Sequence, residues 1–299
     1  MIFLQYVYIQ EKEKSKKIWW QKFNRIKMEK IGDNSYLYTV SHLNHKNTLK
    51  QLEKKIHKKQ GKEVQVIFSK EAEFLKKQWK GKKINIETFK KISLPLLLDY
   101  LLDQIQEKPQ TLLLQDIYFC AKTLNEENKQ IIEYFLEKVK TVNIVTTELK
   151  SFQKLEEKCG KEKGIWITVS NNKRKSLNKA RWIINLDFSA EQLETYQINR
   201  QAMIINCTEE KITKEKGFEG VIVQSFDIEL VSPVEKILEE KFTSLAIIAS
   251  QFSFVLDYEE NVRKLKQMGV NIRNLIGING KINQKELLNH KKFLTNKNI

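Results

Sequence analysis

Short β-branched runs alternate with helical segments between residues 111 and 226, and this rhythm constrains the fold more than any other feature of the sequence. The strand candidates are Thr111–Cys120, Val142–Thr146, Ile165–Val169, Trp182–Leu186, Met203–Cys207 and Val221–Phe226. Helical segments or turns separate most of them at intervals of roughly 20–30 residues, which is typical of strands joined by crossover connections. We therefore predict an α/β fold with a doubly wound, mainly parallel sheet.

The intervening helices carry the expected terminal signals. One helix opens at Asn125, with Glu126 and Glu127 in its first turn, where acidic side chains suit the positive end of the helix dipole. A second spans Ser151–Cys159 and is predicted to end at Gly160, and Ser189–Tyr196 forms another helical segment. A final long helix is predicted from Pro233 through Phe252, packing back on one of the domains.

The first third of the chain is predicted to be a mixed α/β domain. Its strand candidates are Met1–Gln10, Ile18–Met28, Tyr36–Val40 and Val64–Phe68, and its helix candidates are Leu49–Lys59 and Leu94–Ile105. Pro109 ends the last helix, so we place the domain boundary at Lys108-Pro109-Gln110. The prediction is a basic mixed domain over residues 1–108 and a Rossmann-like domain with C-terminal helices over 109–299.

The positive charge of the chain is concentrated in this first third. Of 53 Lys and Arg residues against 37 Asp and Glu, residues 1–91 hold 23 and 9, a net charge of +14 out of +16. Such asymmetry can mark a surface that binds nucleic acid or another acidic partner. However, 47 of the 53 cations are Lys, as expected of an A+T-rich coding genome, and Arg is the residue that reads bases and clamps phosphates. We therefore favour solvated helix faces and keep nucleic-acid binding as an alternative.

The sequence shows no clear signal for secretion, for membrane insertion or for disulfide bonds. The apolar N-terminus lacks a basic segment and a cleavage site, which disfavours a signal peptide. The longest uncharged run, Phe242–Leu256, has 15 residues, fewer than the roughly 20 that a spanning helix needs. Three dispersed cysteines, Cys120, Cys159 and Cys207, disfavour a disulfide framework or a four-cysteine zinc site. We expect a cytoplasmic protein with no membrane association and no bound metal.

Over residues 94–256 the chain resembles the dinucleotide-binding half of shikimate-dehydrogenase-like two-domain oxidoreductases. Ala180-Arg181-Trp182-Ile183-Ile184-Asn185 stands where such proteins have an Ala-Asp-Ile-Val-Ile-Asn-like strand, and Ala202–Asn206 looks like the next strand. The helix after Pro233 looks like the returning C-terminal helix of that family. The resemblance implies an NAD or NADP cofactor, bound beyond the carboxyl ends of the strands.

The Gly-rich turn of that family is missing. A side chain in this turn would stop the backbone from approaching a pyrophosphate, yet no glycine occurs between Gly81 and Gly160. Glu126 and Glu127 would also repel a phosphate at the helix start. A Lys/Asp pair matching the catalytic motif of the family is not found in the first domain. Either the ligand is not a dinucleotide, or the fold persists as a non-catalytic scaffold.

Polar residues predicted at the carboxyl edge of the sheet are the candidate ligand-binding residues. They are Glu148, Ser170, Asn171, Asn172, Lys173, Arg174, Asn185 and Asp187. The resemblance would place Glu148 on a ribose hydroxyl, although an acid at a helix N-terminus is the simpler interpretation. Lys173 and Arg174 could hold phosphate, and an exposed turn explains that loop about as well. Thr146, Asn206 and Thr208 are expected at the same edge.

Two further clusters have simpler explanations. His42 and His45, with His57, could be part of a metal site, but a surface pair is favoured. Trp19 and Trp20, with Phe23, could stack on nucleic-acid bases, although alternating burial along a strand is favoured.

The sequence thus supports a non-catalytic binding or regulatory module with no cofactor, which recognises an unknown small molecule or protein partner. Any ligand would lie in a cleft lined by Glu148, Asn171, Asn185 and Asp187. An NAD(P)-dependent oxidoreductase is the first alternative, and nucleic-acid binding through residues 1–91 is the second.

Overall fold

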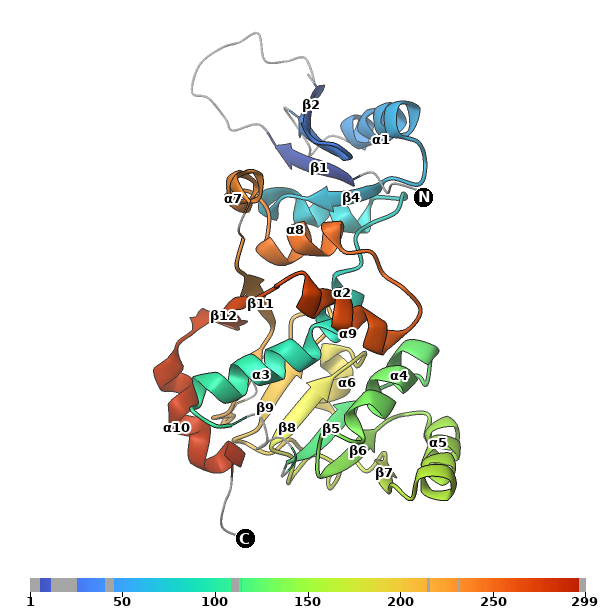
Figure 1. The fold of residues 1–299 in the computed structure, drawn as a ribbon, viewed down its shortest axis with the longest axis vertical. Helices are drawn as coiled ribbons and strands as arrows, with labels where there is room; N and C mark the ends of the chain where they lie inside the picture. Colours follow the sequence, from blue (N-terminus) through green and yellow to red (C-terminus); the bar gives the residue numbers. More distant parts are fainter. Residues whose placement is uncertain are drawn as a thin grey trace. The chain divides into compact units, whose positions relative to one another are not determined.

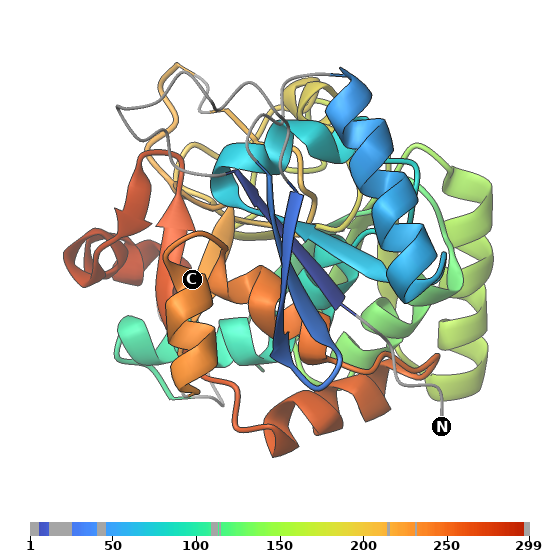
Figure 2. The same ribbon diagram turned by 90° about the horizontal axis from the view of Figure 1, so that it is seen from above.

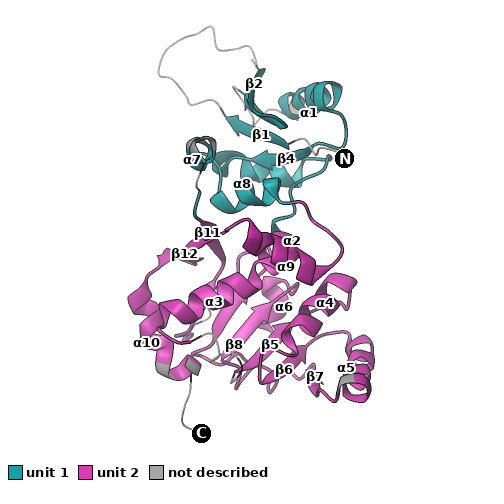
Figure 3. Ribbon diagram, in the orientation of Figure 1, with its two compact units in different colours: residues 1–86, 229–252 teal, residues 87–228, 253–299 magenta. Residues whose placement is uncertain are grey.

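The chain forms two compact units, which Figure 3 shows in different colours. The computed structural model describes residues 6–11, 26–40, 46–108, 113, 115–213, 216–230 and 232–295. Unit 1 comprises Met1–Ile86 and Glu229–Phe252, and unit 2 comprises Glu87–Ile228 and Ser253–Ile299. We predicted a division at residues 108–109; Pro109 and Gln110 lie outside the described residues. Helix α3 (Leu94–Gln104), which the prediction assigned to the first domain, belongs to unit 2.

Unit 2 is built on a six-stranded sheet in which every neighbouring pair of strands is parallel (Figure 1). Its strands are β5 (Asp116–Cys120), β6 (Thr141–Val145), β7 (Ile167–Ser170), β8 (Trp182–Asn185), β9 (Met203–Asn206) and β10 (Val221–Val223). They lie in the order β10-β9-β8-β5-β6-β7, which is the arrangement of doubly wound dinucleotide-binding sheets. The predicted α/β fold with a Rossmann-like parallel sheet is confirmed.

Helices and a small antiparallel sheet complete unit 2. The helices are α2 (Ile86–Ile92), α3, α4 (Glu126–Phe135), α5 (Leu149–Lys163), α6 (Ala190–Glu194), α9 (Tyr258–Gln267) and α10 (Gln284–Thr295). The second sheet has the order β11 (Ser225–Ile228), β12 (Ile272–Gly277), β13 (Gly280–Ile282). All residues of β8 and β9 are buried, as expected of parallel strands covered on both faces.

Two predicted element boundaries in unit 2 are wrong. Helix α5 continues through Gly160 to Lys163, and Gly164, with a φ of 65°, is the left-handed residue that ends it. The run Val221–Phe226 is not one strand: β10 ends at Val223 and β11 begins at Ser225 in the antiparallel sheet. In both cases the apolar residues lie in regular structure as predicted, but the residue that ends the element is not the predicted one.

Unit 1 contains a four-stranded mixed sheet with helices packed on it. Its strands lie in the order β2 (Ile26–Gly32), β3 (Ser35–Val40), β1 (Tyr6–Glu11), β4 (Gln65–Phe68). Strand β1 is parallel to both neighbours, whereas β2 and β3 form an antiparallel hairpin. Helix α1 (Lys46–Gln60), seen beside this sheet in Figure 2, contributes Leu49, Leu52 and Ile56 to the core. Of the predicted strand Ile18–Met28, residues 18–25 lie outside the described residues.

The predicted long helix from Pro233 is two helices of unit 1, and this prediction is corrected. They are α7 (Pro233–Glu239) and α8 (Ser244–Gln251), and the 3-10 helix η2 (Lys70–Lys77) belongs to the same unit. Thr243 separates the two helices because its Oγ1 accepts a hydrogen bond from the Ala246 amide at 3.2 Å, which starts a new helix. The Tyr8 hydroxyl and Ser250 Oγ lie 2.8 Å apart and join α8 to β1.

Among the described helices, none is both long enough and apolar enough to cross a lipid bilayer.

We expect Gly220→Ala to destabilise the protein by about 3 kcal/mol or more, because overpacking against backbone cannot relax cheaply. A Cβ at Gly220 would lie 2.0 Å from the Ala202 carbonyl oxygen and 2.6 Å from the Phe218 ring. The control is Gly160→Ala, where the nearest atom would be 4.0 Å away and a gain of up to about 1 kcal/mol is expected. Chemical denaturation followed by circular dichroism measures both, and equal stabilities of the two variants would contradict the packing of β10 on β9.

Candidate functional site

The candidate site is the point where the order of the parallel sheet reverses. From β5 the chain winds towards β6 and β7, and from β8 it winds the opposite way towards β9 and β10. Strands β5 and β8 are neighbours, and Cys120 lies beside Asn185 at their carboxyl ends. In doubly wound sheets the crevice outside this point is the place where ligands bind. The turns after Cys120 and Asn185 therefore decide what unit 2 can hold there.

The carboxylate of Asp187 fills the turn between β5 and α4. It accepts hydrogen bonds from the backbone amides of Lys122 and Thr123, the latter at 3.3 Å. Thr123 Oγ1 donates to it at 3.2 Å, and Asn128 Nδ2 donates at 2.9 Å. Backbone amides of such a turn are the groups that would bind the phosphates of a dinucleotide. In this chain a carboxylate from the neighbouring strand end already occupies them.

The first turn of α4 is also capped by side chains of the chain itself. Asn125 Oδ1 accepts the amide hydrogen of Asn128 at 2.7 Å, which confirms the predicted helix start. Glu127 binds α2, because its carboxylate accepts the Lys91 ammonium at 2.6 Å and the Thr88 hydroxyl at 2.6 Å. The first turn of α4 therefore already has its polar groups engaged by side chains of the chain itself.

Two asparagines close the edge between β8 and β9. Asn185 Nδ2 donates to Asn206 Oδ1 at 3.0 Å, and its Oδ1 accepts the Phe188 amide hydrogen at 2.9 Å. Asn206 Nδ2 donates to Gln224 Oε1 at 3.0 Å, and Thr208 Oγ1 donates to Asn206 Oδ1 at 3.0 Å. Both asparagines are buried, so their amides hold neighbouring strand ends together rather than facing an open cleft.

Lys90 closes the edge between β9 and β10. Its ammonium donates to the carbonyl oxygens of Gln224 at 2.7 Å, Thr208 at 2.8 Å and Asn206 at 3.3 Å. The side chain is only 6% exposed. With its protons directed at three carbonyl groups, this ammonium binds strand ends and is not placed to act as a nucleophile or a base.

The remaining predicted residues lie on the other half of the sheet. Glu148, after β6, is exposed, and its side chain makes no capping hydrogen bond to α5. After β7, Ser170 Oγ lies 2.7 Å from Ser176 Oγ, and Asn172 Oδ1 accepts the amide hydrogen of Arg174 at 3.0 Å. Asn171, Asn172, Lys173 and Arg174 are exposed. The loop is a turn hydrogen-bonded within itself.

The structure thus brings Asn185 and Asp187 together at the centre of the edge and leaves Glu148, Asn171 and Arg174 on its exposed side. Sequence reasoning missed Lys90, Lys91 and Asn128. The sequence carries no signal for the lysines, since α2 holds only three apolar residues among seven and its two adjacent lysines resemble those of a solvated helix face.

Metal and thiol chemistry find little support at this edge. Within the described residues, no group of three or more His, Cys, Asp or Glu side chains is placed to hold a metal ion, and His42 and His45 lie outside those residues. Burial raises the pKa of the Cys207 thiol to about 12, and burial together with the Asp187 charge raises the pKa of Cys120. Thiols of this kind are poor nucleophiles at neutral pH.

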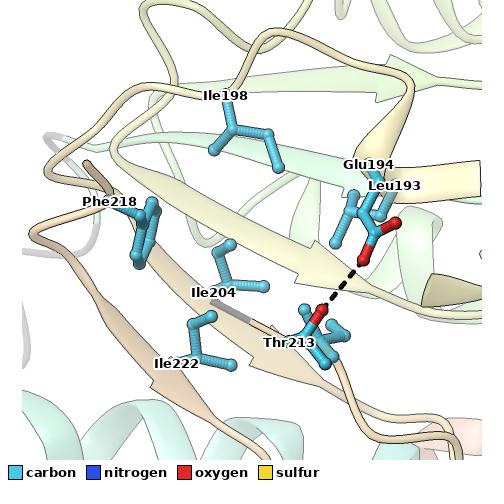
Figure 4. Close-up of a pocket in the computed structure, with 8 residues that line it drawn as sticks. Leu193, Glu194, Ile198, Ile204, Thr213, Phe218 and Ile222 are labelled. Atoms are coloured by element: carbon cyan, nitrogen blue, oxygen red, sulfur yellow. Dashed lines mark hydrogen bonds between the residues drawn. The ribbon is translucent and has the colours of Figure 1, made fainter. Parts of the chain in front are cut away.

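An apolar pocket of unit 2 lies beside α6 and β9 (Figure 4). Leu193, Ile198, Ile204, Ile212, Phe218 and Ile222 supply its apolar walls, and Thr213 Oγ1 donates to Glu194 Oε1 at 2.9 Å across one side. Its volume is about 20 Å³, room for about one water molecule. It cannot replace the closed crevice as a nucleotide site.

Comparison of the chain with protein-family models and with curated proteins finds no match.

Replacing Asp187 with alanine is expected to destabilise unit 2 by about 2 kcal/mol, since hydrogen bonds to a charged group are lost and the part-buried donors of Thr123 and Asn128 lose their acceptor. Glu148→Ala is the matched control, because this exposed carboxylate stands at the same edge without a capping bond; a change within about 0.5 kcal/mol is expected. Guanidinium denaturation measures both. If the two variants are equally stable, Asp187 does not hold the turn.

All three thiols should resist a maleimide in the native protein and react after denaturation, since Cys120, Cys159 and Cys207 are buried. Mass spectrometry of the labelled chain counts the reacted thiols. Rapid labelling of Cys120 before denaturation would mean that the carboxyl edge opens to solvent.

Proposed function

We propose that this chain is a non-catalytic binding or regulatory module whose Rossmann-like sheet no longer takes a dinucleotide. The observation that carries the proposal is the carboxylate of Asp187, which accepts the amide hydrogens of Lys122 and Thr123 in the turn after β5. A diphosphate requires those amides for itself.

Displacing Asp187 would be costly for two reasons. Its hydrogen bonds would have to break, and those made to a charged group contribute about 1.5–3 kcal/mol each. The diphosphate would then lie close to the displaced carboxylate of Asp187, and the two negative charges would repel each other. Glu127 adds little to this repulsion, because its carboxylate is paired with the Lys91 ammonium at 2.6 Å.

The groups that could perform acid–base chemistry at this edge are already engaged. Lys91 is 5% exposed and paired with Glu127, and the Lys90 ammonium is directed at three carbonyl oxygens. A general acid or base must reach a substrate proton at hydrogen-bond distance. This arrangement favours the binding module over the oxidoreductase, whose family residues 94–256 resemble.

We expect NADH and NADPH to leave the thermal midpoint of the wild-type protein unchanged and to show no increase in nicotinamide fluorescence. A ligand that binds only the folded state stabilises it by an amount that grows with the logarithm of its concentration above Kd, so a nucleotide that bound the crevice would raise the midpoint. A known nicotinamide-dependent dehydrogenase serves as the positive control. Saturable binding accompanied by turnover of a hydroxy or oxo acid would overturn the proposal.

The Asp187→Ala variant tests the cause. Without the carboxylate, the amides of Lys122 and Thr123 are available, so inorganic pyrophosphate should stabilise this variant more than the wild type. Glu148→Ala should behave as the wild type does. Equal responses of all three proteins would show that Asp187 does not exclude the anion.

A further inference from the structure

A groove lies along one face of α5 in unit 2, beside the residue that precedes β7. It is lined by Gln153, Glu156, Glu157, Gly160, Lys161 and Trp166 and has a volume of about 560 Å³. The first five of these recur at intervals of three and four residues, so they share one helix face. The groove uses none of the side chains that fill the edge around Asp187.

Trp166 forms the wall of this groove opposite the helix. Its side chain is 81% exposed, which is unusual for so large an apolar ring. The left-handed Gly164 ends α5 and turns the chain back, and the Ile165 amide donates to the Cys159 carbonyl at 3.4 Å. The indole therefore lies beside Gly160 of α5 and is largely exposed to solvent.

Gly160 forms the floor of the groove. It stands inside α5 and is not among the residues with a positive φ, so its backbone does not require glycine. Space does not require it either, because the nearest atom to an added Cβ would be Trp166 Cζ3 at 4.0 Å. Glycine inside a helix costs about 1 kcal/mol relative to alanine. What its missing side chain provides is room under the indole ring.

The charges of the groove favour a cation. Glu156 and Glu157 form no ion pair with any described residue, and burial, with a smaller contribution from Glu157, raises the pKa of Glu156. Lys161 also lines the groove but pairs with neither carboxylate. By contrast, Glu162 on the same helix lies 3.8 Å from Lys158. Two unpaired carboxylates thus stand beside an exposed indole in a chain of net charge +16.

We propose that this groove binds a lysine or arginine side chain of a partner polypeptide, with the cation over the Trp166 ring and against Glu156 and Glu157. Tryptophan is the strongest cation–π partner among the side chains, and the carboxylates add Coulomb attraction. The partner is a polypeptide because β7 is an edge strand of the six-stranded sheet, so an extended segment can run beside the groove. The inference stands whether or not the crevice at Asp187 is closed.

The test is titration of the full chain with the capped peptide Gly-Ser-Lys-Lys-Ser-Gly, observed by NMR at the indole N–H of Trp166. That resonance is identified by its loss in Trp166→Leu. Binding of the peptide should weaken as salt is added, and a peptide with norleucine in place of lysine should not bind. Equal binding of the norleucine peptide, or tighter binding of tetramethylammonium than of the lysine peptide, would overturn the proposal.

Substitutions separate the contribution of the Trp166 ring to peptide binding from that of the two carboxylates. Trp166→Leu keeps an apolar side chain but removes the ring, and should weaken peptide binding about threefold, measured by calorimetry. The double variant Glu156→Gln with Glu157→Gln should weaken it about fivefold and reduce its salt dependence. Glu162→Gln, outside the groove, is the matched control and should change nothing.

The variant Gly160→Ala distinguishes a loss of binding from a loss of folding. It should raise the thermal midpoint, because it strengthens the helix, and yet weaken peptide binding, because its methyl group enters the groove. Undiminished binding by this variant or by Trp166→Leu would overturn the proposal.

Discussion

The backbone amides of Lys122 and Thr123 turn towards the carboxyl edge of the parallel sheet, and the carboxylate of Asp187 accepts their hydrogen bonds. In a doubly wound sheet these amides belong to the turn where a nucleotide ligand would bind. Asp187 comes from the end of β8, the strand that lies next to β5 at the reversal of strand order. The neighbouring position of β5 and β8, which normally creates a binding crevice, therefore also brings the Asp187 carboxylate into that crevice.

The edge is filled in the same manner on the side of this point that carries β8, β9 and β10. Asn185 and Asn206 join β8 to β9, and the Lys90 ammonium joins the ends of β9 and β10 through three carbonyl groups. Each of these polar groups is buried and would be expensive to leave without a partner. A ligand entering the edge would have to replace several satisfied hydrogen bonds at once. Exposed surfaces of unit 2 are therefore the better candidates for function, and the groove at Trp166 combines shape, an aromatic ring and two carboxylates without an ion-pair partner among the described residues.

Periodicity predicted most of the parallel sheet because the strands of such a sheet are buried on both faces. Trp182–Asn185 and Met203–Asn206 are continuous apolar runs, each closed by an asparagine, and they were recognised for that reason. The helix at Asn125 was placed correctly because its cap is local, an Asn side chain bonding an amide three residues later. Errors arose where a local signal was overlooked, namely the left-handed Gly164 that ends α5 and the Thr243 cap that starts α8, and where the chain leaves one sheet for another after Val223. Helix α9 and the strands β12 and β13 were not predicted.

What the sequence by itself determined is the succession of parallel strands with the helices α4, α5 and α6 between them, and the lack of glycine in the turn after β5. Both follow from local chemistry, namely burial patterns, caps and the space a side chain needs. It also supplied Asp187 and Asn185 as residues of the carboxyl edge. Only the tertiary structure decided which groups these residues bind. Asp187 binds Thr123, and Lys90 binds Gln224, across 60 or more positions of the chain. Such pairs follow from the order of strands in the sheet and not from spacing along the sequence.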